Sequence, residues 1–267
     1  MADGHPEISL HTDQHGVLTI TLDRPHTLNS LTFEIYARLE RLFVDLEADA
    51  SVKCVVLTGS GRGFCSGGNV EEIIRPLLER DAGQTLQFTR MTGAVVRNMR
   101  RLSKPIIAAV NGVAAGAGTV LALASDLRIL SHQATFAFLF SKVGLTGADM
   151  GAAYLLPRVV GMGRATELLL FGDKVDAAEC LRIGLANKVV PHEELMAEAH
   201  AWARRLATGP TLAHALTKRL LLNESHMDLD AAIEQEAQAQ ALLLRAYDHA
   251  EFYRAWSEKR QPRFEGR

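Results

Sequence analysis

The chain has 267 residues, of which 48% are hydrophobic and 22% charged, and its formal net charge at pH 7 is −2. This composition is typical of a soluble globular protein that buries a large core in one domain, or in one domain with an appendage. The near-neutral balance argues against a basic nucleic-acid-binding surface and against an acidic disordered segment, so no nucleic-acid partner is expected.

The sequence also indicates a cytoplasmic location. Three cysteines, Cys54, Cys65 and Cys180, form no CxxC pair and are odd in number, which is typical of reduced thiols. Residues 1–7 lack the charged and apolar regions of a secretory signal. The apolar run 105–125 approaches membrane-spanning length, but an asparagine and three glycines interrupt it. We therefore expect a buried strand, a turn and a helix there, and no membrane partner.

Predicted strands and helices alternate along the first half of the chain. Alternating or apolar, β-branched patterns predict strands at residues 17–22, 53–58, 105–110 and 126–130. Amphipathic patterns predict helices at residues 32–46, 84–101 and 120–124, and Thr32 is the predicted N-cap of the first helix. This βαβαβ order implies parallel strands joined by crossover helices.

The second half is predicted to be mostly helical. Helices are expected at residues 151–160, 164–170, 177–183, 192–207, 212–223 and 229–247, and a single strand at 188–190. The predicted fold class is therefore α/β, with an α/β core that carries a helical carboxyl-terminal part.

A glycine-rich loop at residues 59–69 follows the predicted strand 53–58. Glycines let the backbone approach a ligand closely, and successive N–H groups can then point at one oxygen. Phe64 breaks a GxGxxG dinucleotide fingerprint, and no GxSxG elbow is present. Two alternatives to an anion-binding loop remain: a purely structural turn, or a nucleophile at Cys65 or Ser66, for which no paired histidine lies nearby in the sequence.

A second loop, residues 111–119, joins the predicted strand 105–110 to a helix. A helix that starts here presents free N–H groups and the positive end of its dipole, which suits an anion. No Gly-Lys-Ser/Thr follows, so the loop is not a nucleotide-binding P-loop. Tight packing of small residues explains this composition equally well.

Taken in this order, the two loops closely resemble those of the crotonase (enoyl-CoA hydratase/isomerase) superfamily. The segments that carry the resemblance span nearly the whole chain: 22–25, 61–69, 104–118, 184–190 and 258–264.

The resemblance implies a fold, an assembly and a ligand. It implies a crotonase-like ββα spiral core over residues 1–200 and a helical trimerisation region over residues 201–267. A homotrimer or a dimer of trimers is then expected, with an acyl-CoA substrate and no cofactor beyond the CoA moiety of that substrate.

By the same resemblance, the main-chain N–H groups of Ser66 and Ala117 would form an oxyanion hole for the thioester oxygen. Two fixed donors meet the developing charge without reorganising, and loss of one such donor typically costs ~3 kcal/mol. The other residues expected to contact the acyl-CoA are Arg24, Gly67, Gly68, Gly116, Phe252 and Lys259. For the last two and for Arg24, a solvated or core position is an open alternative.

The chain departs from the hydratase pattern at two positions. Typical hydratases hold and activate water with two glutamates, and the matching positions here are Val120 and Phe140. One acid remains nearby, Asp149, either as a helix N-cap or as a general acid/base whose pKa is raised by apolar surroundings. A similar aspartate occurs in dienoyl-CoA isomerases and in ring-epoxide isomerases. Glu71 and Glu72 could supply another acid, although a solvated face is the simpler interpretation for them.

A lone carboxylate beside an oxyanion hole suits a proton shuttle that moves a double bond, so isomerisation is favoured with Asp149 as the acid/base. The alternatives are a nucleophilic Asp149, a hydratase that uses Asp149 or another acid, and a non-catalytic acyl-CoA-binding protein. Ten histidines show no ligand spacing such as HExxH, so no metal site is expected.

Overall fold

The computed structural model describes residues 7–267, so nearly all of the segment that was searched for a secretory signal lies outside the described residues. A six-stranded sheet has the order β1-β2-β3-β5-β7-β10. Only the β1–β2 pair is antiparallel, and the other neighbours are parallel. The strands are β1 (Ile8–Thr12), β2 (Val17–Leu22), β3 (Cys54–Gly59), β5 (Ile106–Val110), β7 (Leu127–Ser131) and β10 (Lys188–Val190).

A four-stranded sheet with the order β4-β6-β8-β9 accompanies it. Its strands are short: β4 (Gly63–Cys65), β6 (Val113–Ala115), β8 (Thr135–Ala137) and β9 (Val175–Asp176). In chain order β3 leads to β4, β5 to β6 and β7 to β8, so successive turns of the chain give one strand to each sheet. This is the predicted ββα spiral, and the fold class is confirmed.

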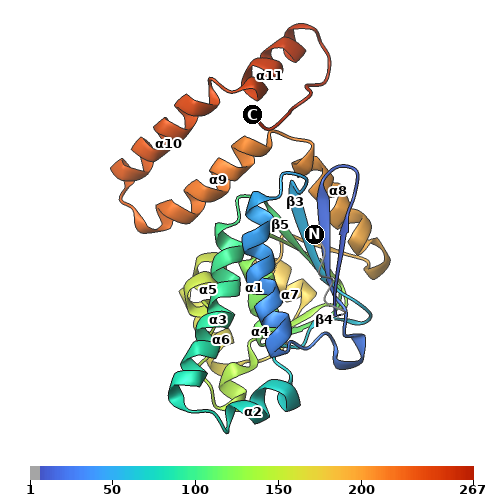
Figure 1. The fold of residues 1–267 in the computed structure, drawn as a ribbon, viewed down its shortest axis with the longest axis vertical. Coiled ribbons are helices and arrows are strands. Elements are labelled where there is room, and N and C mark those ends of the chain that lie inside the picture. The colour runs from blue at the N-terminus through green and yellow to red at the C-terminus, as the bar shows by residue number, and fades with distance from the viewer. Residues whose placement is uncertain (1–6) are drawn as a thin grey trace.

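The helices cover both faces of the larger sheet (Figure 1). They are α1 (Phe33–Ala48), α2 (Arg75–Leu77), α3 (Ala82–Arg101), α4 (Ala117–Ala124), α5 (Ala152–Val160), α6 (Met162–Phe171), α7 (Ala177–Arg182), α8 (Leu195–Ala207), α9 (Thr211–Asn223), α10 (Leu229–Leu243) and α11 (Tyr247–Ser257). Shorter turns are η1 (Pro25–Thr27), η2 (Val70–Ile74), η3 (Leu139–Val143), η4 (His192–Glu194) and η5 (Glu224–His226).

Strand β3 shows why the apolar runs were readable as buried strands. Val55 and Leu57 belong to the main core, whereas Cys54 and Val56 face a second core under α8. Because both faces of a parallel sheet are covered, its strands are apolar throughout and do not alternate. The apolar run 105–125 likewise forms the predicted buried strand, β5, and the predicted helix, α4, and the segment between them includes the short strand β6, which was not predicted.

Helix α1 begins where the sequence predicts. Thr32 is extended, and its Oγ1 accepts the Ile35 N–H at 3.2 Å. At the other end of the chain, the predicted helix 229–247 ends earlier, at Leu243, as α10, and α11 (Tyr247–Ser257) was not predicted. The chain turns between them because Ala246 is extended (φ −71°, ψ 152°), and α11 then continues to Ser257.

Helices α9, α10 and α11 form an arm that extends away from the core (Figure 1). The predicted boundary at residue 200 falls inside α8, whose Ala199, Ala203 and Ala207 are buried against the larger sheet. The arm therefore begins at α9, where the buried Lys218 pairs with Asp126 of the core at 2.7 Å. Within residues 7–267, no helix is long and apolar enough to cross a membrane.

Candidate active site

The two glycine-rich loops contact each other through their backbones. A Cβ on Gly118 would lie 2.1 Å from the Cys65 carbonyl oxygen, so only glycine fits there. Gly67 has a φ of +94°, and a Cβ on it would lie 2.9 Å from the Ala115 carbonyl oxygen. Glycine is required at both positions, because any side chain would separate the loops or strain the turn.

Two buried asparagines hold the first loop in shape. Asn29 Nδ2 donates to the carbonyl oxygens of Ser60 and Gly63 at 2.9 and 2.7 Å. Asn111 Nδ2 donates to those of Gly61 and Gly63 at 2.9 and 3.0 Å. These two side-chain amides bind loop carbonyl groups that have no partner in a sheet. They therefore hold this long loop in one conformation.

Ser66 is already engaged on the side away from α4. Its N–H donates to the Leu28 carbonyl at 2.9 Å, and its Oγ donates to the Thr27 carbonyl at 2.9 Å. These bonds contradict the predicted role of Ser66 as an oxyanion donor, because its N–H points at a protein acceptor. They also argue against Ser66 as a nucleophile.

Gly68 carries the amide that is left free. The Gly67 carbonyl accepts the Leu31 N–H at 2.8 Å. In a trans peptide the C=O and the next N–H point in opposite directions, and the described chain has no cis bond. The Gly68 N–H therefore points away from Leu31, toward the side where β6 and α4 lie, and no described residue accepts it.

Ala117 supplies a second free amide, as predicted from the start of a helix. It is the first residue of α4, and the Gly116 carbonyl before it accepts the Thr119 N–H at 3.1 Å. The Ala117 N–H therefore points out of the helix, and no described group accepts it. A Cβ on Gly67 would lie 3.4 Å from the Ala117 nitrogen, so the two amides belong to loops in contact.

Cys65 is an unsuitable nucleophile. It is fully buried, and burial raises the pKa of its thiol to about 12. A thiol that stays protonated at neutral pH does not attack a thioester efficiently.

The two positions that carry glutamate in typical hydratases are buried and apolar. Val120 lies inside α4 with no exposed surface, and Phe140 is 8% exposed in η3. Neither side chain can hold a water molecule or exchange a proton, so any acid or base in this site comes from another segment.

Asp149 is a half-buried acid that is not a helix cap. The residue before α5 is Gly151, and no side chain caps that helix. Asp149 Oδ1 accepts only the N–H of the next residue, Met150, at 2.8 Å. Burial raises the pKa of the Asp149 carboxyl, and this hydrogen bond lowers it in part. The carboxyl is therefore a stronger base than an ordinary aspartate.

Tyr36 is a buried tyrosine of α1. It is 3% exposed, and burial raises the pKa of its hydroxyl well above the usual value. Electrostatic interaction with Cys65 and Asp149 raises the Tyr36 pKa further. Sequence reasoning missed Tyr36, because a lone tyrosine on the buried face of a helix carries no motif.

The acids after Asn69 are paired at the surface. Glu72 binds Arg24 at 2.6 Å, and Glu71 lies 3.5 Å from Arg75. Arg24 itself is 6% exposed and also binds Glu7 at 2.9 Å. The Arg24 guanidinium is therefore enclosed by carboxylates, and its predicted contact with CoA requires one of them to be displaced.

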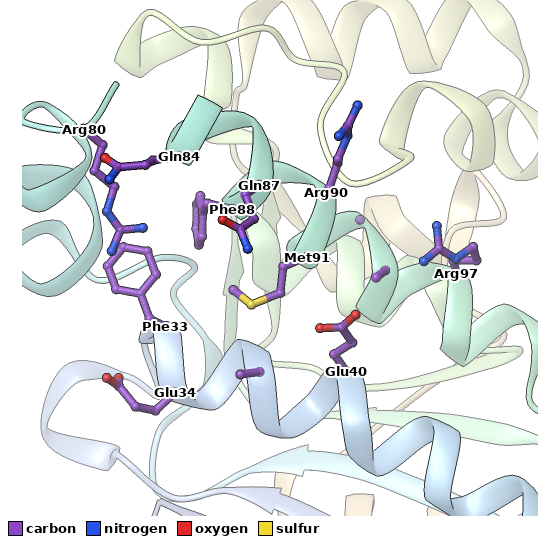
Figure 2. Close-up of a pocket in the computed structure, with 13 residues that line it drawn as sticks. Phe33, Glu34, Glu40, Arg80, Gln84, Gln87, Phe88, Arg90, Met91 and Arg97 are labelled. Carbon is purple, nitrogen blue, oxygen red and sulfur yellow. The ribbon is translucent and has the colours of Figure 1, made fainter. Parts of the chain in front are cut away.

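A groove of about 1200 Å³ runs between α1 and α3. Figure 2 shows Phe33 and Phe88 facing each other across one end of it, with the Arg80 guanidinium 4.1 Å over the Phe33 ring. The groove includes neither glycine loop nor Asp149.

The predicted contacts in the arm lie apart from the loops of the same chain. Phe252 is 53% exposed on α11, and Lys259 is exposed just beyond that helix. Figure 1 shows α10 and α11 as the outer layer of the arm, with α9 between them and the core. The structure of one chain therefore does not bring Phe252 and Lys259 to the two loops. Among residues 7–267, no three His, Cys, Asp or Glu side chains are grouped to hold a metal.

Comparison with known proteins identifies the family. The family model described as enoyl-CoA hydratase/isomerase matches residues 12–267. The chain belongs to the enoyl-CoA hydratase/isomerase family. It is therefore an enzyme of the hydratase/isomerase class, and the resemblance of the two loops to crotonases is confirmed.

Named relatives within the hydratase/isomerase family include both activities. The chain is 39% identical to a 1,2-epoxyphenylacetyl-CoA isomerase of Escherichia coli (strain K12), over 98% of this chain and 99% of that protein. It is 33% identical to a short-chain-enoyl-CoA hydratase of Clostridium acetobutylicum, over 92% of both chains. A crystal structure from Streptomyces coelicolor A3(2), named provisionally as an enoyl-CoA hydratase, matches with a TM-score of 0.96 and 52% identity, over 100% of this chain and 98% of that one.

Proposed function

We propose that the protein is an acyl-CoA isomerase. It stabilises a thioester enolate at the main-chain amides of Gly68 and Ala117 and moves a proton through Asp149. The observation that carries this proposal is the replacement of both hydratase glutamates by the buried Val120 and Phe140, while the half-buried Asp149 keeps a free carboxylate oxygen.

The amides act on the charge that the reaction creates. Removal of a proton from the acyl chain delocalises a negative charge onto the thioester oxygen. The N–H groups of Gly68 and Ala117 have no acceptor in the described protein, so they are available to that oxygen. Because both are fixed by loop contacts, they stabilise the enolate without reorganising, by ~3 kcal/mol for each donor.

Asp149 carries the proton from one carbon to another. As a carboxylate it takes a proton from the acyl chain, and the electrons move onto the thioester oxygen. As a carboxylic acid it returns the proton to a different carbon, and the double bond has then moved. Burial raises the pKa of Asp149, so its carboxylate is a stronger base toward the acyl chain than an ordinary aspartate.

The named relatives support a reaction of this class. The relative named 1,2-epoxyphenylacetyl-CoA isomerase aligns over almost its full length. Other relatives are named as hydratases, which favours water addition as the second candidate. In that case Asp149 or another acid would activate the water, because positions 120 and 140 cannot.

The remaining contacts are proposed for the CoA moiety and the assembly. Gly67 and Gly116 are proposed to border the thioester, and Arg24 is proposed to contact the CoA moiety. Helix α10 has no buried residue in a single chain and exposes Leu229 (73%) and Ile233 (52%). Such a face favours contact with another copy of the chain, and the family resemblance implies a homotrimer or a dimer of trimers. In that assembly the exposed Phe252 and Lys259 of the arm would reach the ligand of a neighbouring copy. We propose a cytoplasmic enzyme that needs no cofactor beyond the CoA of its substrate.

Two substrates test the reaction. The purified protein is incubated with a 3-enoyl-CoA and, separately, with crotonyl-CoA, and the products are separated by chromatography. The proposal predicts migration of the double bond in the first and slow hydration of the second, with isomerisation lost in Asp149→Asn. Rapid hydration of crotonyl-CoA that survives Asp149→Asn would contradict the proton shuttle.

A further inference from the structure

Arg128 of β7 is a buried arginine that the proposed function does not use. It is 6% exposed. Its Nη1 donates to the carbonyl oxygens of Ser125 and Leu123 at 2.7 and 3.4 Å, and its Nε donates to that of Leu185 at 2.6 Å. Leu123 lies in the last turn of α4, and Ser125 is the residue that ends this helix. Arg128 therefore binds the end of α4 opposite Ala117, the residue whose amide is proposed to hold the thioester oxygen.

The charge of Arg128 faces main-chain carbonyl groups. Within residues 7–267, the hydrogen-bond partners of its guanidinium are carbonyl oxygens and not carboxylates. The nearby carboxylate of Asp126 pairs with Arg100 at 3.2 Å and with Lys218 at 2.7 Å. Arg100 also donates to the Ala124 carbonyl of α4 at 3.5 Å, but Asp126 offsets its charge. Burial lowers the pKa of Arg128 to about 10, so its guanidinium still carries a positive charge at neutral pH.

Helix α4 is short and enclosed, so the charge at one end acts on the other. Its eight residues span ~12 Å, and all of them are buried. A helix carries about half a positive charge at its amino-terminal end and about half a negative charge at its carboxyl-terminal end. In a buried helix little water screens the negative end, which therefore weakens the attraction of the Ala117 amide for a negatively charged oxygen. A cation bound at the negative end cancels that effect.

Arg128 also joins α4 to the rest of the core. Thr119 is the one polar side chain of α4, so the other side chains hold the helix by apolar packing, which is not directional. Arg128 is itself fixed at its main chain by Asn187. Asn187 Oδ1 accepts the Arg128 N–H at 2.8 Å, and the Asn187 N–H donates to the Arg128 carbonyl at 2.9 Å. The hydrogen bonds from this rigid arginine define where the end of α4 lies.

We propose that Arg128 is a positioning residue of the thioester site, whose buried cation anchors α4 and strengthens the hold of the Ala117 amide on the thioester oxygen. The inference rests on the proposed function, because it places that oxygen at the amides of Gly68 and Ala117. Arg128 itself does not touch the substrate. Its removal should therefore reduce the polarisation of the thioester carbonyl and leave binding of the CoA moiety unchanged.

The absorption spectrum of bound cinnamoyl-CoA tests the inference. Its carbonyl is conjugated with the phenyl ring, so polarisation of the carbonyl shifts the ultraviolet absorption to longer wavelength. Binding to the parent protein, recorded directly after mixing, is expected to produce such a shift. Arg128→Gln replaces the cation by a neutral donor and should lose most of the shift. Arg128→Lys keeps a cation but cannot bind all three carbonyl groups, so its shift should be intermediate.

Two further measurements separate positioning from general stability. In Arg128→Gln, kcat for isomerisation of a 3-enoyl-CoA should fall about tenfold, less than the ~10²-fold or more expected when an oxyanion donor is removed outright. The dissociation constant of free CoA, measured by calorimetry, should stay within about twofold of the parent value. Leu195→Ala is the control, because Leu195 is 1% exposed in the second core under α8. It should lower the melting temperature and leave the spectral shift unchanged.

The outcomes distinguish this inference from the proposed function. An undiminished shift in Arg128→Gln overturns the role of Arg128 while the thioester site stands. If Arg128→Gln does not fold, an undiminished shift in Arg128→Lys has the same meaning. Loss of the shift in Leu195→Ala as well would reveal a general effect of stability and also overturn the inference. Absence of any shift in the parent protein would remove the thioester site itself, and the inference with it.

Discussion

Replacement of Asp149 by asparagine is expected to change activity and stability in opposite directions. Asparagine keeps the shape of the side chain and the Oδ1 acceptor for the Met150 N–H, which lies at 2.8 Å. The turn before α5 should therefore be preserved. What disappears is the ionisable group, and with it both the proton shuttle and the cost of burying a charge.

The expected loss of activity follows from the proposed role of the carboxyl. A positioned general acid/base contributes about 10²–10⁴-fold to a rate, so kcat for isomerisation should fall by about that factor in Asp149→Asn. The amides proposed to hold the thioester oxygen remain, so binding of the acyl-CoA should change little.

The expected change in folding stability has a defined sign and a defined pH range. Because burial raises the pKa of Asp149 in the folded protein, folding favours its protonated form. The protein is then most stable, as far as this group is concerned, below the unfolded pKa of ~3.9, and it loses stability as the pH rises through the folded pKa. Asp149→Asn should therefore melt at a higher temperature than the parent at pH 7, and this difference should vanish toward pH 4.

The assay pairs isomerisation rates with thermal unfolding across this pH range. Asp173→Asn is the matched control, because Asp173 is exposed and pairs with Lys142 at the surface. It should change neither the rate nor the melting temperature appreciably. A fully active Asp149→Asn, or one that melts at a lower temperature at pH 7, would refute the reasoning.

Three further substitutions, two of them with a matched control, test the loops, the arm and the assembly. Gly118→Ala places a Cβ 2.1 Å from a backbone carbonyl of the facing loop, so kcat/KM and the urea midpoint should both fall. Gly163→Ala meets nothing within 4 Å and should stabilise α6 by up to about 1 kcal/mol. Lys218→Met removes a buried cation from the partly buried carboxylate of Asp126 and should cost about 1–3 kcal/mol in urea unfolding, whereas Lys142→Met at the surface should cost less than ~1 kcal/mol. Ile233→Glu puts a charge on the apolar face of α10 and should reduce the mass measured by light scattering to that of a monomer; an unchanged mass would contradict the proposed interface.

The sequence predicts those strands whose pattern of apolar residues reflects their burial. β2 was placed at its observed bounds, and β3 and β5 within a residue, because strands covered on both faces are apolar along their length. The strands β4, β6 and β8 were not predicted. Each is three residues long, and β4 and β6 lie inside the glycine loops, so their strand character comes from pairing with each other and not from their own side chains.

The candidate site shows the same division. Both loops were found from residue types and their order, whereas Ala117 and Asp149 were predicted as site residues from the resemblance to crotonases. Ser66 was wrongly predicted as an oxyanion donor, because the direction of a main-chain N–H depends on hydrogen bonds to distant parts of the chain. Leu28 and Leu31, more than thirty residues earlier, decide which amide is used internally and which is left free. No local pattern encodes that choice.

The separation of main-chain amides from side-chain acids explains how one fold can carry different reactions. The thioester oxygen is proposed to be held by main-chain amides, which depend on Gly67 and Gly118 for close contact and not on any functional side chain. Side chains at Val120 and Phe140 can therefore become apolar without disturbing that site, and they pack into the core instead. The reaction then depends on whichever acid another segment supplies. In this chain Asp149 is presented by a turn in which Met150 adopts a φ of +50°, an uncommon conformation for a residue with a side chain. Strain of this kind persists where the surrounding structure enforces it, and here it orients the N–H that holds the carboxylate.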